Sequence, residues 1–339
     1  MPLAISAVNR CPNHSWFRVE RLSGLCYVDS TTYIGDLMSA LLPILNSNAL
    51  PGADPSLIVS GEQDWKPKLE RLRRRLRQSS RWLIAFSGGI DSAFLLAIAV
   101  QERGSDVLAI TAVSPTLPDE ERADCSRVAA ALGANHRFIE SNEMEVEGFY
   151  SNPTNRCFFC KEELYRVAWG AAKMLGYEQV ADGMNVDDLK DHRPGHKAAQ
   201  EAGVVHPLEE AGLTKADIRG AARALGLDIW NKPAFACLSS RFPYGTQITQ
   251  ERLHMVGSVE ALLKELGFRQ YRVRYHGEVC RIEVRPVDLP RLIEEPTRST
   301  ITKLCNSVGF RYVTVDLQGY RQGAMNEGLG LKPTEDDAG

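Results

Sequence analysis

The sequence predicts an α/β protein in which a doubly wound parallel sheet is followed by a second, smaller α+β domain. Two observations predict this architecture. Between residues 82 and 183, short apolar segments alternate with longer amphipathic ones, as strands and helices do around a parallel sheet. After residue 249 this alternation is replaced by a helix, a hairpin, two further helices and a last strand. The length of 339 residues is sufficient for two domains with a core each.

The larger domain begins with the pattern of an amphipathic helix and continues with strands and helices in turn. Leu69, Leu72 and Leu76 recur at helical spacing, and Gly104 and Gly133 follow two later helices, where glycine commonly ends a helix. The predicted strands are Leu83–Phe86, Val107–Val113, His136–Ile139 and Gln179–Ala181, and the predicted helices are Lys66–Ser79, Ser92–Arg103, Pro118–Leu132 and Phe158–Leu175.

The smaller domain is predicted from a hairpin pattern, with His276–Gly277 as its turn, between helical segments. Its predicted elements are the helix Gln250–Leu266, the strands Tyr271–Tyr275 and Val279–Val284, the helices Val287–Glu294 and Thr297–Val308, and the strand Tyr312–Asp316. We therefore expect a partly disordered N-terminal extension over 1–60, the α/β domain over 61–232, a Pro- and Gly-rich loop with the small domain over 233–325, and a flexible tail over 326–339.

Composition and charge exclude several classes of protein. The formal net charge of -3 argues against a surface that is basic throughout, and therefore against general nucleic-acid binding. No apolar run reaches the roughly 18 residues of a membrane span, since Pro43 and polar residues interrupt the segment Leu37–Leu50. The N-terminus lacks the charged start and apolar core of a secretory signal. We therefore expect a cytoplasmic protein.

A basic segment coincides with the first predicted helix. The basic residues between its leucines are Lys68, Arg71, Arg73, Arg74, Arg75 and Arg77. We interpret them as the solvated face of an amphipathic helix. The alternative is an electrostatic contact for RNA.

The most specific motif is Ser87-Gly88-Gly89-Ile90-Asp91-Ser92, between a buried strand and a helix. Glycines permit backbone angles that let consecutive N–H groups converge on an anion, and the helix N-terminus adds its positive dipole end. No Gly-Lys-Ser/Thr follows, so the loop is not a Walker A motif. It resembles the SGGxDS motif of the PP-loop ATP pyrophosphatases, which implies a fold of that type and cleavage of ATP between its α- and β-phosphates.

The 8 cysteines indicate metal binding or catalysis more than a disulfide framework, because the chain is large and expected in the cytoplasm. Cys157 and Cys160 have a C-x2-C spacing, at which two thiolates bind one metal ion or one cluster. Cys237 lies in a loop rich in Pro and Gly, and such loops often carry function. We interpret two N-terminal cysteines and a histidine as incidental residues rather than a metal site: Cys11, Cys26 and His14.

With these motifs together, the chain resembles the LarE family, the sulfur transferases that make the nickel-pincer cofactor. The resemblance covers about residues 65 to 325. Its segments are Ser87–Ser92, Asn155–Lys161, Asp182–Gly183, Asp187–Asp188, Arg193–Gly195, Pro233–Gly245, Arg272–Arg274, Arg281–Glu283 and Asp316–Arg321. It implies that ATP adenylylates a carboxylate of pyridinium-3,5-biscarboxylic acid mononucleotide, with release of pyrophosphate, and that a sulfur nucleophile then displaces AMP. The second carboxylate is treated in the same way.

The resemblance leaves two sulfur donors open. In one branch of the family the cysteine that matches Cys237 is the only one of the three, and it surrenders its own sulfur to become dehydroalanine. In the other branch three cysteines hold a [4Fe-4S] cluster whose free iron carries an exchangeable sulfide. This chain has Cys157, Cys160 and Cys237, so we favour the cluster. Arg241, nearby in sequence, would favour the thiolate of Cys237 in either case.

The matching motifs also imply roles for other residues. The loop residues Ser87, Gly88, Gly89, Asp91 and Ser92 are expected to bind the ATP phosphates and Mg²⁺, with Gly183 near the α-phosphate. Lys161 is expected to neutralise charge that develops during adenylyl transfer.

Further positions are expected to bind the substrate, a metal ion or another subunit. Arg272 and Arg274 alternate along a strand and are expected to grip the substrate phosphate, with exposed arginines as the alternative. Glu283 and Asp288 are expected to bind a divalent metal at a subunit contact, with paired surface charges as the alternative. The family implies a homo-oligomer, a hexamer in particular. The histidines His192, His196 and His206 are interpreted as structural or solvated.

Two other functions are compatible with parts of the sequence. A PP-loop tRNA thiolase would combine the same phosphate loop with a three-cysteine cluster, and salt-sensitive binding of tRNA would support it. Net acidity and the Arg272/Arg274 motif argue against it. A non-catalytic regulator that senses ATP or AMP is the third reading, because fold alone does not determine function. It leaves the three cysteines unexplained.

Overall fold

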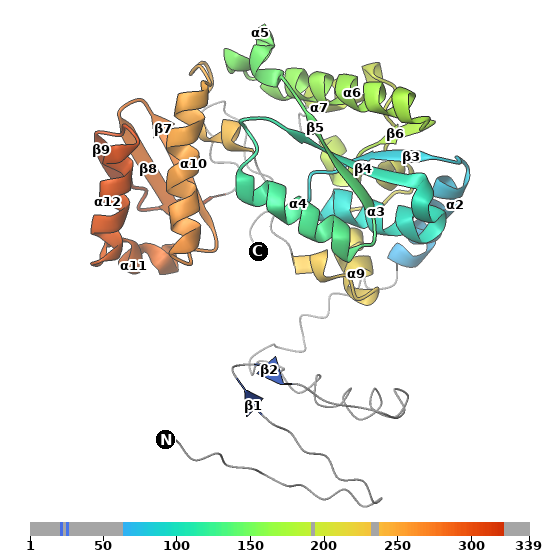
Figure 1. Cartoon of the computed structure of the whole chain (residues 1–339), viewed down its shortest axis with the longest axis horizontal. Helices are drawn as coiled ribbons and strands as arrows, with labels where there is room; N and C mark the ends of the chain where they lie inside the picture. Colours follow the sequence, from blue (N-terminus) through green and yellow to red (C-terminus); the bar gives the residue numbers. More distant parts are fainter. Residues whose placement is uncertain (1–20, 23–24, 27–63, 191–193, 232–236, 322–339) are drawn as a thin grey trace, which may run out of the picture. The chain divides into compact units, whose positions relative to one another are not determined.

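The computed structural model describes residues 21–22, 25–26, 64–190, 194–231 and 237–321 (Figure 1). The chain divides into two compact units, Met1–Val59 and Ser60–Gly339. In the first unit, the described residues form a short antiparallel pair of β1 (Arg21–Leu22) and β2 (Leu25–Cys26). The other predictions for residues 1–60, for His192 and for the tail 326–339 lie outside the described residues.

Each strand and helix predicted for the larger domain is present at nearly the predicted boundaries. The strands are β3 (Trp82–Ala85), β4 (Val107–Val113), β5 (Asn135–Glu140) and β6 (Gln179–Ala181). The helices that were predicted are α2 (Trp65–Arg77), α3 (Ile90–Arg103), α4 (Asp119–Ala131) and α6 (Arg156–Leu175). The four strands form one parallel sheet in the order β5-β4-β3-β6.

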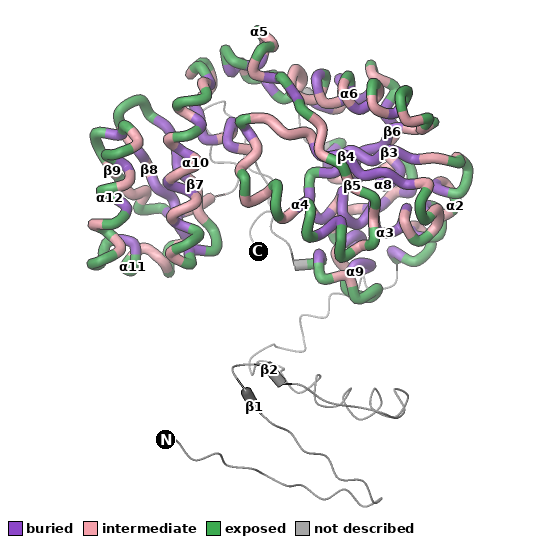
Figure 2. The backbone as a smooth tube through the Cα atoms, in the orientation of Figure 1, coloured by how far each residue is buried: buried purple, intermediate pink, exposed green. Residues whose placement is uncertain are grey.

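Helices cover both faces of this sheet, as predicted. Trp82 and Ile84 of β3 point into a core that contains apolar side chains of α2, α3 and α4. Leu83 of β3 and Leu108 of β4 point to the opposite face, where Tyr165 of α6 is buried. Figure 2 shows the strands buried between these two layers. The α/β class with a doubly wound parallel sheet is thereby confirmed, because successive residues of one strand face different helices.

Residues 194–224 contain three helices for which the sequence was not assigned any element. They are α7 (Pro194–Glu201), α8 (Pro207–Glu210) and α9 (Lys215–Ala224). Ala198 and Ala199 of α7 pack against α6, and Ile218 of α9 packs against α2 and α3. Alanine is only weakly apolar, so helices whose buried face consists mainly of alanine have a weak periodic signal.

Asp217 of α9 links this helix to α2, and its removal should destabilise the fold. It completes a capping box with Thr214 and accepts a hydrogen bond from Lys68 Nζ at 2.9 Å. Burial would raise the pKa of Asp217, but the hydrogen bonds from Lys68 and Thr214 hold it below the ordinary value of 3.8. A carboxylate with a depressed pKa stabilises the folded state above its unfolded pKa, and this contribution is lost as pH falls through the folded pKa.

We therefore expect Asp217→Asn to lower the free energy of unfolding by about 1 kcal/mol at neutral pH. The difference from the unmodified chain should shrink as pH falls below 3.8. Urea unfolding at several pH values measures this difference. Asp228→Asn, at an exposed position shortly after α9, is the matched control. A difference that persists unchanged at low pH would contradict the argument.

The basic side chains of α2 bind acidic residues and carbonyls of the same unit. Arg73 and Arg77 both pair with Glu102 of α3, and Arg75 pairs with Glu210 at 2.6 Å. Arg71 donates to a backbone carbonyl at 3.0 Å. These contacts hold α2 against α3 and α8, and they agree better with the amphipathic-helix interpretation than with an RNA contact.

The smaller domain has the predicted α+β composition. It contains α10 (Gln250–Glu265), β7 (Tyr271–His276), β8 (Val279–Val284), α11 (Leu289–Ile293), α12 (Thr297–Ser307) and β9 (Tyr312–Val315). β8 pairs antiparallel with β7 and parallel with β9. The turn Pro286–Asp288 is a 3-10 helix where the prediction had α-helix, because Pro286 and Pro290 each lack the amide that an α-helix would use.

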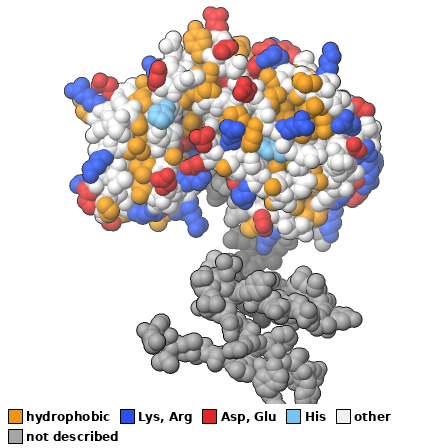
Figure 3. Space-filling view, viewed as in Figure 1, with side chains coloured by type: hydrophobic (Ala, Val, Ile, Leu, Met, Phe, Trp, Pro, Cys, Tyr) orange, Lys and Arg blue, Asp and Glu red, His pale blue; other side chains and the backbone are white. Residues whose placement is uncertain are grey.

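Over the described residues, no helix is both long and apolar enough to cross a bilayer. Acidic and basic side chains are interspersed over the face of the second unit that Figure 3 shows.

Candidate active site

The predicted phosphate loop lies at the point where the order of strands reverses. β3 is followed in sequence by β4 on one side, whereas β6 pairs with β3 on the other side. The segment Ser87–Gly89 leaves the carboxyl end of β3 and leads into α3. In open α/β sheets, ligands bind outside the carboxyl ends of the strands at this switch point. The motif therefore occupies the position at which the fold is best suited to bind a ligand.

Hydrogen bonds within the loop hold its amides around the N-terminus of α3. Gly88 has φ 72°, a backbone angle that favours glycine. The Ser92 hydroxyl donates to the Gly89 carbonyl at 3.1 Å and accepts from the Ser87 amide at 3.3 Å. Because these bonds fix the loop from within, the amides at the helix N-terminus are organised before an anion arrives.

Gly183 directly abuts this loop. A Cβ atom at residue 183 would lie 2.6 Å from the backbone N of Ser92 and 2.8 Å from its Cα. Only a residue without a side chain fits there, since the obstructing atoms belong to the backbone. The end of β6 and the first turn of α3 thus form two sides of one small region, as the sequence-based grouping of Gly183 with the loop requires.

Asp182 and Lys161 border the same region. Lys161 Nζ lies 4.0 Å from Asp182 Oδ2, and the lysine side chain is 38% exposed. Burial would raise the pKa of Asp182, but the hydrogen bond from His206 and the charge of Lys161 lower it to about 2. Lys161 therefore presents a cation beside a permanent carboxylate.

Lys215 is a candidate site residue that the sequence analysis did not single out. It begins α9, and its Nζ lies 3.9 Å from Asp91 Oδ2 in the first turn of α3. Its backbone amide donates to Asp187 at 2.8 Å. The sequence signal was a lysine just after a capping threonine, which indicates a helix start but no phosphate site.

The loop that begins at Cys237 is attached to the carboxyl edge of the sheet. The amide of Leu238 donates to the carbonyl of Thr116, which follows β4. Arg156 is buried and donates to the carbonyl of Ser239 at 2.9 Å. Asn152 donates from its side chain to the carbonyl of Pro243 at 2.8 Å. These bonds place the loop beside the N-terminus of α6, where Cys157 and Cys160 lie.

The three cysteines interact electrostatically. Burial raises the pKa of the Cys160 thiol, and Cys237, Glu143 and Cys157 raise it further. Among the described residues, a search for ligand atoms within 4.8 Å of one another does not group these thiols. They are therefore not arranged around one metal ion. In a cluster each thiolate binds a different iron, so a wider spacing is expected, and the donor set fits a cluster with one open iron.

Glu143 is a buried carboxylate close to these thiols. Its oxygens accept hydrogen bonds from the hydroxyls of Ser114, Thr116 and Ser141. The sequence analysis did not identify this group, because its members lie at the ends of two different strands and no local spacing connects them. It brings negative charge to the region around Cys160.

Three arginines gather behind the Cys237 loop. Arg241 forms a bidentate pair with Glu260 and donates to the carbonyl of Cys237 at 3.1 Å. Burial and the nearby guanidinium of Arg241 lower the pKa of Arg272, and Arg274 adds to this effect. Such a concentration of positive charge is suited to a phosphate.

Arg274 and the two predicted metal ligands are engaged in ion pairs. Arg274 is buried and binds Glu283 through two nitrogens, each at 2.9 Å. Arg281 also binds Glu283, at 3.0 Å, and Arg285 binds Asp288 at 2.7 Å. A metal ion at Glu283 or Asp288 would have to compete with these arginines. The metal assignment stays a prediction.

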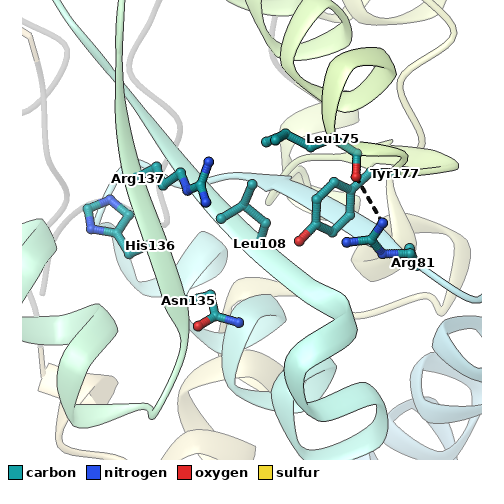
Figure 4. A pocket seen from close by; sticks show the side chains of 7 residues that line it. All are labelled: Arg81, Leu108, Asn135, His136, Arg137, Leu175 and Tyr177. Atoms are coloured by element: carbon teal, nitrogen blue, oxygen red, sulfur yellow. Dashed lines mark hydrogen bonds between the residues drawn. The ribbon is translucent and has the colours of Figure 1, made fainter.

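A separate pocket lies at the opposite, amino end of the strands (Figure 4). It has a volume of about 310 Å³ and is lined by Arg81, Leu108, Asn135, His136, Arg137, Leu175 and Tyr177. Arg81 donates to the Leu175 carbonyl at 2.8 Å and lies over the Tyr177 ring. These bonds occupy the side chain that would otherwise face a ligand. The phosphate loop and the three cysteines are at the other edge of the sheet.

Comparison with known proteins supports this reading of the site. The family model described as asparagine synthase matches residues 69–186. An uncharacterized protein of Synechocystis sp. is 43% identical over 262 residues, or 77% of this chain and 98% of the relative. The pyridinium-3,5-bisthiocarboxylic acid mononucleotide synthase of Lactiplantibacillus plantarum is 38% identical over 255 residues, or 75% of this chain and 92% of the relative. The chain belongs to the LarE family.

The LarE family consists of ATP-dependent sulfur-transferring enzymes of the PP-loop superfamily, so the family, the fold type and the enzyme class inferred from the motifs are confirmed. A more distant similarity is to the tRNA-specific 2-thiouridylase of Desulforamulus reducens, which is 25% identical over 196 residues. That match covers 45% of this chain and 53% of the thiouridylase. The LarE relative matches a much larger share of both chains.

Proposed function

We propose that this LarE-family chain, acting in the cytoplasm, converts the carboxylates of pyridinium-3,5-biscarboxylic acid mononucleotide to thiocarboxylates, with formation of AMP and pyrophosphate. One observation carries the proposal: the phosphate loop, Lys161 and the cysteine loop share the carboxyl edge of one sheet. The relative from Lactiplantibacillus plantarum, named for the bisthiocarboxylic product, supports the choice of substrate. The product belongs to nickel-pincer cofactor synthesis.

The first step is adenylylation. Ser87, Gly88, Gly89, Asp91 and Ser92 bind the β- and γ-phosphates and Mg²⁺, an ion that neutralises phosphate charge. A substrate carboxylate oxygen attacks the α-phosphorus, and the bond from that phosphorus to the bridging oxygen breaks, which releases pyrophosphate. Gly183 leaves room for the α-phosphate next to the loop. The Lys161 ammonium stabilises the negative charge that develops on the transferring group.

The second step is sulfur transfer. The acyl adenylate is a mixed anhydride, so a sulfur nucleophile attacks its carbonyl carbon and the bond to AMP breaks. A [4Fe-4S] cluster held by Cys157, Cys160 and Cys237 would supply an exchangeable sulfide. The proximity of the three thiols favours this donor.

The alternative donor is Cys237 itself. Its thiolate would form a thioester with the substrate as AMP leaves. Removal of the Cα proton of residue 237 would then break its Cβ–Sγ bond, leaving dehydroalanine in the chain and a thiocarboxylate on the substrate. Atoms and electrons balance without an added reductant. Arg241, close to Cys237, would favour the thiolate form.

Arg272 and Arg274 are proposed to bind the substrate phosphate. Arg274 is already held by Glu283, so Arg272 has the greater freedom to bind a ligand. We expect Arg272→Ala to raise KM for the mononucleotide by about 10- to 100-fold, with a smaller change in kcat, because a charge-assisted hydrogen bond is lost. Steady-state kinetics measures both constants. Arg269→Ala, at an exposed position before β7, is the matched control and should leave KM unchanged.

The test of the proposed function is the release of pyrophosphate from ATP in the presence and absence of the dicarboxylate mononucleotide. Substrate-dependent pyrophosphate and AMP in equal amounts are expected. Formation of ADP and phosphate, or no dependence on the substrate, would refute the proposal. Failure with every carboxylate substrate would support a regulator that senses ATP or AMP, whereas modification of tRNA would support a thiolase.

Assembly and the second metal site complete the proposal. We propose a homo-oligomer, a hexamer by family resemblance, with a divalent ion at Glu283 and Asp288 of a subunit contact. Sedimentation analysis with and without a chelator measures the assembly. A monomer under both conditions would exclude it.

A further inference from the structure

Three side chains that the proposed function does not use gather beside Asp182. They are His196 of α7, His206 just before α8, and Glu209 within α8. One ligand atom from each lies within 4.8 Å of the others. The two imidazole rings are stacked with centroids 5.6 Å apart, and His196 Nε2 lies 3.7 Å from Glu209 Oε2. The sequence analysis interpreted both histidines as structural or solvated.

His206 is oriented by a buried carboxylate. Its Nδ1 lies 2.7 Å from Asp182 Oδ1, and its side chain is 11% exposed. The other oxygen of Asp182 accepts a hydrogen bond from the Tyr165 hydroxyl at 2.5 Å. A carboxylate that accepts the Nδ1 proton leaves Nε2 as the atom with a lone pair. This is the arrangement by which outer carboxylates hold histidine ligands of metal ions.

Glu209 provides an independent observation. Its Oε2 atom is buried and has no hydrogen-bond partner among the described residues. A buried carboxylate oxygen without a partner destabilises a fold, so such an atom requires an explanation. A cation between Glu209 and the two histidines would satisfy it.

We propose that His196, His206 and Glu209 bind a divalent transition metal ion of the zinc class. Two imidazoles and one carboxylate suit such an ion, and a water molecule would complete a tetrahedral shell. Mg²⁺ prefers oxygen ligands and water, so this site is distinct from the Mg²⁺ that accompanies ATP. It also differs from the three-cysteine set in every residue.

The ion would link α7, α8 and, through His206 and Asp182, the end of β6. These elements border the phosphate site: a Cβ at Gly195, next to His196, would lie 3.0 Å from the Lys161 side chain. Occupancy would therefore stiffen the wall against which Lys161 packs. This inference does not depend on the identity of the substrate.

The test measures zinc that the full chain retains after dialysis, by elemental analysis, and zinc affinity, by competition with a chromophoric chelator. Because thiolates also bind zinc, the measurements are repeated with Cys157, Cys160 and Cys237 changed to Ser. We expect one equivalent of zinc in this thiol-free background. His196→Ala and Glu209→Gln should each weaken its binding by about 100-fold. The matched controls His254→Ala and Glu210→Gln, both at exposed positions, should bind zinc as the parent does.

His206→Ala is not used alone, because it also removes the partner of Asp182 and can impair folding. A second measurement is the melting temperature, which zinc should raise in the parent and in the controls but not in the two ligand variants. Absence of zinc binding in the thiol-free chain, or equal binding by the parent and both ligand variants, would overturn the proposal. Pyrophosphate release by the same preparations reports separately on the proposed function.

Discussion

Cys237→Ala is expected to lower thiocarboxylate formation by at least about 1,000-fold while substrate-dependent pyrophosphate release continues. Both proposed sulfur donors require this thiol, either as a cluster ligand or as the donor itself. The phosphate loop and Lys161 belong to other segments, so adenylylation does not depend on the Cys237 side chain. Separate assays of pyrophosphate and of thiocarboxylate by mass spectrometry measure the two steps. Undiminished sulfur transfer in this variant would show that the assignment of Cys237 is wrong.

The matched variant Cys157→Ala distinguishes the two donors. If a cluster supplies sulfide, this variant should also lose sulfur transfer, and the anaerobically purified chain should contain iron and sulfide. If Cys237 is consumed, Cys157→Ala should still transfer sulfur, and the mass of the chain should fall by one sulfur with dehydroalanine at residue 237. The exposed position of Cys157 makes a purely structural effect of its replacement small.

Gly183→Val is expected to reduce substrate-dependent pyrophosphate release by about 100-fold, because small displacements of a catalytic site have large effects on rate. A side chain at residue 183 would meet backbone atoms of Ser92 at 2.6 Å and 2.8 Å, so either the end of β6 or the first turn of α3 must move. The amides proposed to hold the phosphates belong to that turn. ATP affinity, measured by calorimetry, should fall with the rate.

The control for this prediction is Gly170→Ala in α6, where an added Cβ would meet no atom within 4 Å. This variant should retain the rate and the ATP affinity of the unmodified chain. Urea unfolding of both variants separates a local effect from loss of the fold. A folded Gly183→Val variant with undiminished ATP affinity would contradict the proposed position of the nucleotide.

Local signals predicted most of the fold. The strands β3, β4 and β6 are short, buried on both faces and bounded by turn residues, so their apolar runs were visible in the sequence. The phosphate loop was equally visible, because its chemistry lies within six consecutive residues. The helices α7, α8 and α9 were missed, since two are very short or alanine-rich and their packing partners are distant in sequence.

The sequence by itself determined the parallel sheet, the position of the phosphate loop at its edge and the family to which the chain belongs. These depend on residues close together in the chain, whose period and spacing can be read directly. Only the tertiary structure decided which distant side chains meet: Lys215 with Asp91, Arg274 with Glu283, and His206 with Asp182. Such pairs form because the fold brings separate segments together, and no local pattern records the distance between them.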